Sequence, residues 1–311
     1  MIRLKVPLLP NETIICKLFS RNIFTVFDFL QKPSVDLQEI CNMSCKDVSK
    51  LKDALIVSCS VFINGYSLYK NKPINNLIKT GILELDELLN GGLHLGTIYE
   101  FCGPSSCGKT ILCYNIIANY IYFHSSKQII YIDTKFKFSI KRLKEIIALK
   151  CLLPLNQENT ILKKVIIYSI SDVYNLFNCL HNLKPNPEDI IIIDSITVPY
   201  LSFVGSSKNE GLCYISHISS VLHHLTQKNV TIIITNLAVK QSDYFNDEPT
   251  KTSTENNEFK PAIGKYWLHI PNTRLMLSCL PQNKISINIS KSVYLPLNKN
   301  CNIKIYNGGI L

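Results

Sequence analysis

The sequence predicts an α/β fold in which a mainly parallel, twisted sheet is covered by helices on both faces and preceded by a small all-helical domain. Beyond Thr80, apolar segments of strand length alternate with segments of helical periodicity, which is typical of parallel sheets with helical crossovers. Before residue 60, apolar residues recur at helical spacing. The chain has 311 residues, enough for one core of about 230 residues and an appendage.

The N-terminal part is expected to form several short helices, with breaks at Pro33 and Ser44. The residues at helical spacing are Ile23, Val26, Phe27 and Leu30, then Leu37 and Ile40, then Val48, Leu51 and Leu55. A stretch rich in turn-forming Asn, Gly and Pro follows, which predicts a linker. We therefore expect a helical domain at 1–59, a linker at 60–79 and the α/β core at 80–311.

Strands and helices are expected to alternate through the core. The continuous Ile and Val content of its later strands predicts burial on both faces. The expected strands are Thr97–Cys102, Gln128–Asp133, Val165–Ser169, Asp189–Asp194 and Val230–Thr235, and the expected helices are Lys109–Phe123, Ile140–Leu149, Val173–Leu183 and Gly211–Thr226.

Composition excludes several classes of protein. Hydrophobic residues make up 46% and charged residues 18% of the chain, as in globular proteins. The longest apolar stretch, Ile111–Phe123, is too short to cross a bilayer and no secretory signal is visible, so we expect an intracellular protein with no membrane partner. The twelve cysteines are scattered without Cys-x-x-Cys spacing and are expected to be small buried thiols. A net charge of +10, spread along the chain, permits nucleic-acid binding without demonstrating it.

The strongest chemical signal is a loop that fits the pattern G-x-x-x-x-G-K-[ST] between a predicted strand and a predicted helix. Its glycines let successive backbone N–H groups point at phosphate oxygens, its lysine adds charge near the β- and γ-phosphates, and its threonine offers a hydroxyl to Mg²⁺. We expect ATP to bind here, and we expect the lysine to be exposed while the site is empty. The alternative is an ordinary glycine turn. The eight residues are Gly103, Pro104, Ser105, Ser106, Cys107, Gly108, Lys109 and Thr110.

A second element agrees with this loop. Ile190–Asp194 is an apolar strand that ends in a carboxylate, roughly eighty residues after the loop. Such an acid typically completes the Mg²⁺ site, so Thr110 and Asp194 are the expected metal residues. The alternative is that Asp194 caps a helix or a turn.

Further stretches stand around these motifs: Thr80–Gly81, Leu85–Leu89, Gly91–Gly92, Tyr131–Thr134, Asp194–Ser195, Thr235–Asn236, Lys260–Gly264 and Thr273–Leu275. Together they resemble RecA/RadA-type recombinases. The stretches Asn64–Gly65 to Leu68–Tyr69 and Lys260–Trp267 are similar, within that family, to the D-type paralogue of the eukaryotic Rad-fifty-one recombinase. The resemblance implies a RecA-like P-loop NTPase core and a role in homologous recombination repair in the nucleus. It also implies work with other recombinase paralogues and contact with single-stranded or branched DNA.

Two departures from the family pattern concern hydrolysis. Lys135 stands where active recombinases have the glutamate that activates water, and a cation cannot accept that proton. Leu237 stands where they have a glutamine that senses the γ-phosphate, and its side chain has no hydrogen-bonding atom. Asp133 is a conceivable substitute base, but we expect its side chain to point to the opposite face of the strand.

Three further positions are carried over from the family, each with a competing interpretation. Arg142 matches the arginine that packs on the adenine, or is a surface arginine. His269 matches a histidine near the neighbouring subunit's nucleotide, or is a histidine at a strand end. Phe62 to Gly65 lies at the Phe-x-x-Ala polymerisation motif, where the aromatic ring would insert into a neighbour, or Phe62 packs on its own domain.

The DNA-facing loops are expected at about 200–211 and 240–260. In the second loop, acidic residues outnumber basic ones, which disfavours a groove that tracks phosphates, so any DNA contact should be weak or shared with partners.

Three hypotheses remain: an ATP-binding subunit of a paralogue complex with weak or absent hydrolysis, an active DNA-dependent ATPase that performs strand exchange, or another RecA-like ATPase such as a helicase or clock-type hexamer. Lys135 favours the first over the second.

Overall fold

The computed structural model describes residues 12–59, 64–70, 77–124, 126–151, 162–203, 210–240, 259–306 and 309–310. The chain divides into two compact units, Met1–Ile74 and Asn75–Leu311. The division falls within the stretch expected to be the linker, and the domain limits 1–59, 60–79 and 80–311 remain our prediction.

The first unit contains five described helices, of which α1 to α4 contribute to a small apolar core. Ile14, Leu18, Phe29, Leu37 and Leu55 are among the buried residues that pack together there. The helices are α1 (Glu12–Ser20), α2 (Val26–Gln31), α3 (Ser34–Cys41), α4 (Cys45–Cys59) and α5 (Gly65–Lys70).

Local signals define where these helices begin. Thr25 precedes α2 and its hydroxyl accepts the N–H of Asp28 at 3.1 Å, while the Asp28 carboxylate accepts the N–H of Thr25 at 2.9 Å. This reciprocal capping satisfies N–H groups that the helix itself cannot pair. Helix α1 was not expected, although Ile14, Ile15 and Leu18 show a helical spacing, and Asn64 caps the short helix α5 within a stretch expected to contain turns.

The second unit is the α/β core, and its fold class is the predicted one. The described residues form a 10-stranded sheet in the order β12-β11-β10-β9-β3-β7-β6-β4-β5, with β8 paired to β7. All pairings from β9 through β3, β7, β6 and β4 to β5 are parallel. The strands are β3 (Ile98–Gly103), β4 (Ile129–Asp133), β5 (Val165–Ser169), β6 (Ile190–Asp194), β7 (Thr231–Lys240), β8 (Phe259–Pro261), β9 (Thr273–Leu280), β10 (Lys284–Ser292), β11 (Asn300–Tyr306) and β12 (Gly309–Ile310), and a separate pair is β1 (Leu77–Ile78) with β2 (Leu93–His94).

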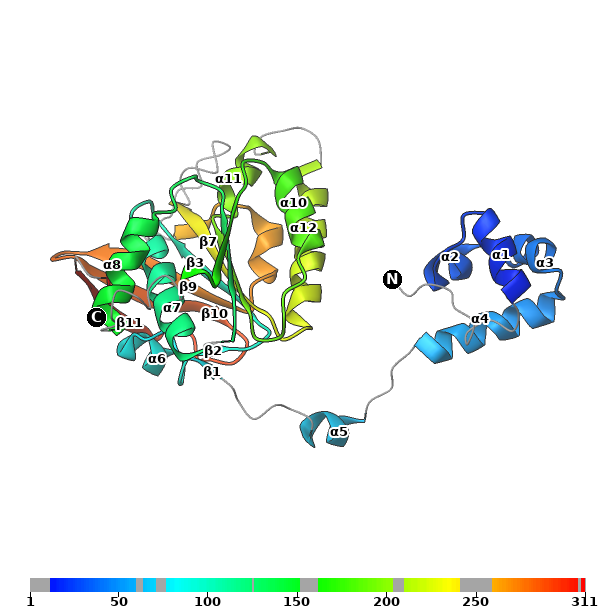
Figure 1. Ribbon diagram of the computed structural model, residues 1–311, viewed down its shortest axis with the longest axis horizontal. Helices are drawn as coiled ribbons and strands as arrows, with labels where there is room; N and C mark the ends of the chain where they lie inside the picture. Colours follow the sequence, from blue (N-terminus) through cyan, green and yellow to red (C-terminus); the bar gives the residue numbers. More distant parts are fainter. Residues whose placement is uncertain are drawn as a thin grey trace, which may run out of the picture. The chain divides into compact units, whose positions relative to one another are not determined.

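Helices cover both faces of this sheet (Figure 1). One apolar cluster lies between the sheet and α6, α7 and α8, and a second lies between the sheet and α10, α12 and η3. The helical segments are α6 (Leu83–Leu88), α7 (Lys109–Phe123), α8 (Ile140–Cys151), α10 (Val173–Asn182), α11 (Thr197–Tyr200), η1 (Leu201–Phe203), α12 (Glu210–Thr226) and η3 (Lys265–His269).

One expectation about the sheet is corrected, and one part of the sheet was not predicted. Strands β6 and β7 are buried as predicted, but β5 is half-buried to exposed along its length. It lies at the end of the strand order, so it lacks a neighbour on one side. The sheet also continues past β9 in antiparallel pairings with β10, β11 and β12, a part that the sequence analysis did not predict.

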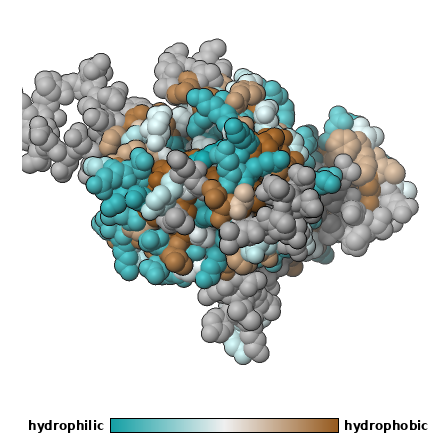
Figure 2. Space-filling view, turned by 60° about the vertical axis from the view of Figure 1, so that its left-hand side comes forward, coloured by the Kyte–Doolittle hydropathy of each residue, from teal (hydrophilic) through white to brown (hydrophobic). Residues whose placement is uncertain are grey.

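The surface carries apolar and polar side chains interleaved, as one face shows in Figure 2. No helix in the described ranges is long and apolar enough to cross a membrane. The expectation of buried thiols is right for Cys41, Cys102, Cys107 and Cys113. It is wrong for Cys16, Cys45, Cys213 and Cys279, which are exposed.

Strand register brings polar residues from distant parts of the chain to one edge of the sheet. Gly103 lies beside Leu237, Asp194 beside Thr235, and Asp133 beside Asp194. These are the carboxyl ends of parallel strands, where open α/β sheets place their ligands.

Candidate nucleotide-binding site

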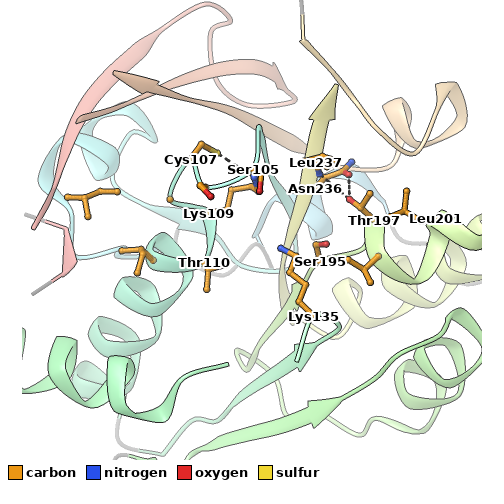
Figure 3. A pocket seen from close by; sticks show the side chains of 15 residues that line it. Ser105, Cys107, Lys109, Thr110, Lys135, Ser195, Thr197, Leu201, Asn236 and Leu237 are labelled. Carbon is orange, nitrogen blue, oxygen red and sulfur yellow. Dashed lines mark hydrogen bonds between the residues drawn. The ribbon is translucent and has the colours of Figure 1, made fainter. Parts of the chain in front are cut away.

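Residues Ser105–Thr110 of the predicted loop line a cavity of about 360 Å³ at this edge of the sheet (Figure 3). The loop connects β3 to α7 and therefore presents the N-terminus of α7 to the cavity. Helix N-termini and their free N–H groups attract anions. The cavity lining is Ser105, Ser106, Cys107, Gly108, Lys109, Thr110, Ile111, Lys135, Ser195, Thr197, Val198, Leu201, Asn236, Leu237 and Ile305.

The loop's shape depends on its last glycine. Gly108 has φ +88°, a left-handed conformation that residues with a Cβ rarely adopt. A Cβ there would lie 2.3 Å from Ile285 Cδ1 on β10. The turn into α7 therefore favours glycine for its backbone conformation, and the Ile285 side chain would have to shift to admit a Cβ there.

Lys109 is buried in this structure, which corrects the expectation that it is exposed while the site is empty. Its side chain is 7% exposed. The ammonium donates to the carbonyl oxygens of Gly103 at 2.7 Å and Pro104 at 2.6 Å, and lies 3.4 Å from Cys107 Sγ. The lysine folds back over its own loop because the carbonyl oxygens there accept hydrogen bonds from its ammonium group.

Asp194 lies beneath the cavity and accepts four hydrogen bonds. Its Oδ2 accepts from the hydroxyls of Thr110 at 2.6 Å and Tyr131 at 2.8 Å, and its Oδ1 accepts from Lys135 Nζ at 2.8 Å and the Thr235 hydroxyl at 2.6 Å. Burial alone would raise the pKa of Asp194, but the Lys135 charge and the hydroxyl donors outweigh burial and hold that pKa below its ordinary value. The carboxylate is therefore ionised at neutral pH.

Lys135 enters the cavity from the turn after β4. Figure 3 shows its side chain pointing between Thr110 and Ser195. Its side chain is 29% exposed, whereas that of its partner Asp194 is 4% exposed. The position that the family pattern assigns to a base thus carries an ammonium group that is paired with the acid expected to serve Mg²⁺.

The residues near Asp194 fit a magnesium ion in part. The Thr110 hydroxyl gives its hydrogen to Asp194, so its lone pairs remain for a cation on the cavity side. Both oxygens of Asp194 already accept two donors each. Thr110 therefore fits as a direct ligand, and Asp194 fits as the negative charge behind it. A bound Mg²⁺ would supply charge compensation to the phosphates at this place.

The described lining of the cavity contains no carboxylate that could act as a base. Asp133 is paired with Asp194 in register on the neighbouring parallel strand, so both side chains face the same side of the sheet. The expectation that Asp133 points to the opposite face is therefore wrong, because β4 ends at Asp133 and strand alternation does not continue to Lys135 in the turn that follows. Asp133 is engaged otherwise: it accepts the N–H groups of Lys135 at 3.0 Å and Phe138 at 2.7 Å.

A buried polar network beneath the site was not predicted. Glu100 on β3 is fully buried and pairs with Arg274 Nε, and its other oxygen accepts from Trp267 Nε1 and Asn236 Nδ2, each at 2.7 Å. Asn236 accepts in turn from the Thr197 hydroxyl at 2.6 Å, and both line the cavity. The signal in the sequence was a glutamate inside the apolar strand Ile98–Gly103.

Tyr131 and Thr235 were also missed as partners of Asp194. Burial raises the pKa of Tyr131, so its hydroxyl keeps the proton that it donates. Neither residue carries a local motif, and only the register of β4, β6 and β7 reveals them.

The remaining expected residues lie outside the cavity or outside the described part. Arg142 is on α8, where it pairs with Glu145 at 3.0 Å and reaches the Tyr306 carbonyl at 3.4 Å, next in sequence to Ile305 of the lining. Its adenine contact and the role of the exposed His269 remain predictions. Phe62 lies outside the described residues, as do most of the expected DNA-facing loops.

Comparison with known proteins gives concordant results. Residues 73–311 match the Rad51 family. The chain is 27% identical over 285 residues to mouse "DNA repair protein RAD51 homolog 4", covering 87% of this chain and 82% of that protein. It is 26% identical to human "DNA repair protein RAD51 homolog 2", covering 91% and 82%. The crystal structure of the RadB recombinase superimposes with a TM-score of 0.60 at 23% identity, covering 75% of this chain and 98% of RadB, a likeness of fold.

Proposed function

This chain belongs to the Rad51 family, and on that basis we propose that it is an ATP-binding recombinase paralogue whose intrinsic hydrolysis is weak or absent. In this proposal it acts in homologous recombination DNA repair as one subunit of a complex with other paralogues. Its relatives are named as DNA repair proteins, which supports the repair role.

ATP binding is supported by the loop around the cavity. The start of α7, with its free N–H groups, lines the cavity, and so does Lys109. Both the N–H groups and the ammonium attract phosphate oxygens. Thr110 offers a hydroxyl to Mg²⁺, with Asp194 behind it. We propose that Gly103–Thr110 holds the phosphates and that Arg142 borders the base.

The ion pair between Lys135 and Asp194 is the observation that most supports weak hydrolysis. General-base assistance contributes roughly a hundred- to ten-thousand-fold to such reactions. The described cavity lining holds the ammonium groups of Lys109 and Lys135 and no carboxylate. Leu237 also lines the cavity, and its side chain has no hydrogen-bonding atom.

The nucleotide that the protein retains tests this proposal. The purified protein is incubated with ATP and Mg²⁺, freed of excess nucleotide and denatured, and the released nucleotide is identified by chromatography. We expect ATP in about equimolar amount. Recovery of ADP from fresh preparations would support the active DNA-dependent ATPase instead, and recovery of no nucleotide would remove the ATP-binding assignment.

The partner and location proposals need a separate test. We propose that other paralogues bind this chain, that contact with single-stranded or branched DNA is weak without them, and that the complex works in the nucleus. Affinity purification from the source cells, with the co-purified proteins identified by mass spectrometry, tests the complex. Absence of any recombinase paralogue from the purified material would contradict it.

A further inference from the structure

The cavity is bordered by two ammonium groups from different elements. Lys109 comes from the start of α7 and Lys135 from the turn after β4, and both line the cavity. A triphosphate carries three to four negative charges at neutral pH, and in water it is usually compensated by Mg²⁺. The arrangement therefore offers charge compensation from the protein itself.

Lys135 is fixed at both its backbone and its side chain. Its N–H donates to Asp133 at 3.0 Å, and its Nζ donates to Asp194 Oδ1 at 2.8 Å. The hydroxyl of the preceding residue, Thr134, donates to the carbonyl oxygen of Ser195 at 2.7 Å and accepts the N–H of Ser195 at 2.8 Å. The ammonium thus has a defined position, and little ordering is left to occur when a ligand arrives.

Lys135 and Thr110 share one carboxylate. Thr110 donates to one oxygen of Asp194 and Lys135 donates to the other, so the ammonium and the expected magnesium ligand flank the same acid. The positive charge of Lys135, fixed beside Asp194, attracts phosphate oxygens and repels a metal cation. The side chain is partly exposed to the cavity, so a ligand can reach the ammonium while the ion pair persists.

We propose that Lys135 is a tethered cation that takes over part of the charge compensation usually supplied by Mg²⁺, so that this site binds ATP with little dependence on the metal. The proposal rests on the proposed function, because it assumes that ATP binds in the cavity. It assigns Lys135 a positive role in nucleotide capture, in addition to the loss of a base.

Isothermal titration of the full chain with ATP tests the proposal, once with excess Mg²⁺ and once with excess EDTA. For the natural sequence we expect the two dissociation constants to agree within about threefold. For Lys135→Met, which keeps the length and removes the charge, we expect removal of Mg²⁺ to weaken binding by about tenfold or more. Lys135→Arg keeps a cation, so its dissociation constants with Mg²⁺ and with EDTA should also agree within about threefold.

Lys127→Met is the matched control. Lys127 also pairs with a carboxylate, Glu188 at 3.0 Å, and its side chain is 25% exposed, but it does not line the cavity. Lys127→Met removes the same unit of charge from the chain as Lys135→Met. Its ratio of the dissociation constants with EDTA and with Mg²⁺ should therefore equal that of the natural sequence. Circular dichroism of each variant establishes that it is folded.

The outcomes separate the inference from the function on which it rests. A natural protein that loses about tenfold or more in affinity with EDTA but binds ATP with Mg²⁺ overturns the inference and leaves ATP binding intact. A protein that binds ATP under neither condition overturns both. Because the natural sequence alone gives these results, the test does not depend on whether Lys135→Met folds.

Discussion

Lys109 and Lys135 carry the same charged group, yet the structure gives them different partners. Lys109 bonds to carbonyl oxygens of its own loop, within a few residues in sequence. Lys135 pairs with Asp194, 59 residues away. A local motif therefore identifies Lys109, whereas the pairing of Lys135 depends on which strands are neighbours.

The first prediction concerns Lys109→Ala. We expect ATP affinity to fall by about tenfold or more, because the variant loses the charge that meets the phosphates. Stability should fall by only about 1 kcal/mol, since the lost hydrogen bonds join the ammonium to neutral carbonyl groups that water can reach once the side chain is gone. Titration calorimetry and urea unfolding measure the two effects. Unchanged ATP affinity would contradict the assignment of the loop.

The residues around Asp194 show how far the sequence determines the site. The expected metal pair, Thr110 and Asp194, does meet, at a separation of 84 residues. Tyr131 and Thr235 donate to the same carboxylate from 63 and 41 residues away. No periodicity in the sequence links them, because their contact follows from strand register, which is set by packing of the whole sheet.

At the scale of elements, hydrophobic periodicity predicted most of the central layer. Helix α7 and strand β5 have the predicted ends, β4 and β6 begin one residue later than predicted, and β3 is shifted by one residue at both ends. The antiparallel strands β10 to β12 were missed, although Ile285, Ile287 and Ile289 alternate as in a half-buried strand. The exposure of β5 could not be read from its Ile and Val content, because edge position is a property of strand order.

The second prediction concerns the buried network that joins β3, β7, β9 and η3. Glu100→Gln should destabilise the core by about 3 kcal/mol, because it leaves Arg274 buried without its carboxylate partner. Glu145→Gln is the control, since it breaks an exposed pair with Arg142 and should cost about 0.5 kcal/mol or less. Guanidinium unfolding compares the two, and equal losses would mean that the buried network contributes nothing specific.

The third prediction concerns the turn between β3 and α7. Gly108→Ala should destabilise by about 2–4 kcal/mol and reduce ATP affinity, because the new Cβ meets Ile285 and the φ of +88° is strained. Gly96 is the control, because it also has a positive φ, +66°, and a Cβ there would lie 2.9 Å from the backbone oxygen of Thr226, but it precedes the other end of β3. Gly96→Ala should therefore cost at least as much stability and leave ATP affinity unchanged. If both variants bound ATP equally well, the loop would not be the phosphate site.

At the scale of the whole molecule, each unit has an apolar core of its own. The fourth prediction follows from this division. Residues 75–311 should fold without the helical unit and bind ATP within about threefold of the full chain, because the described cavity lining lies wholly in the second unit. Circular dichroism and calorimetry of the fragment provide the check. An unfolded fragment would mean that the unit Asn75–Leu311 does not fold independently.

Most of the predicted partner contacts fall on residues outside the described part of the chain. Phe62 and most of the expected DNA-facing loops are among them. The sequence predicted their place only through resemblance to the family. The roles of Phe62 and His269 therefore remain predictions about assemblies.

Single-turnover hydrolysis of ATP by the purified protein, with and without single-stranded DNA, tests the central claim most directly. We expect a rate near that of buffer for the natural sequence, because Lys135 cannot accept a proton and Asp133 is held by two backbone N–H groups. Lys135→Glu should gain hydrolysis, and Lys109→Ala should remove that gain. A rate comparable to an active recombinase from the natural protein, abolished by Lys109→Ala, would contradict the account.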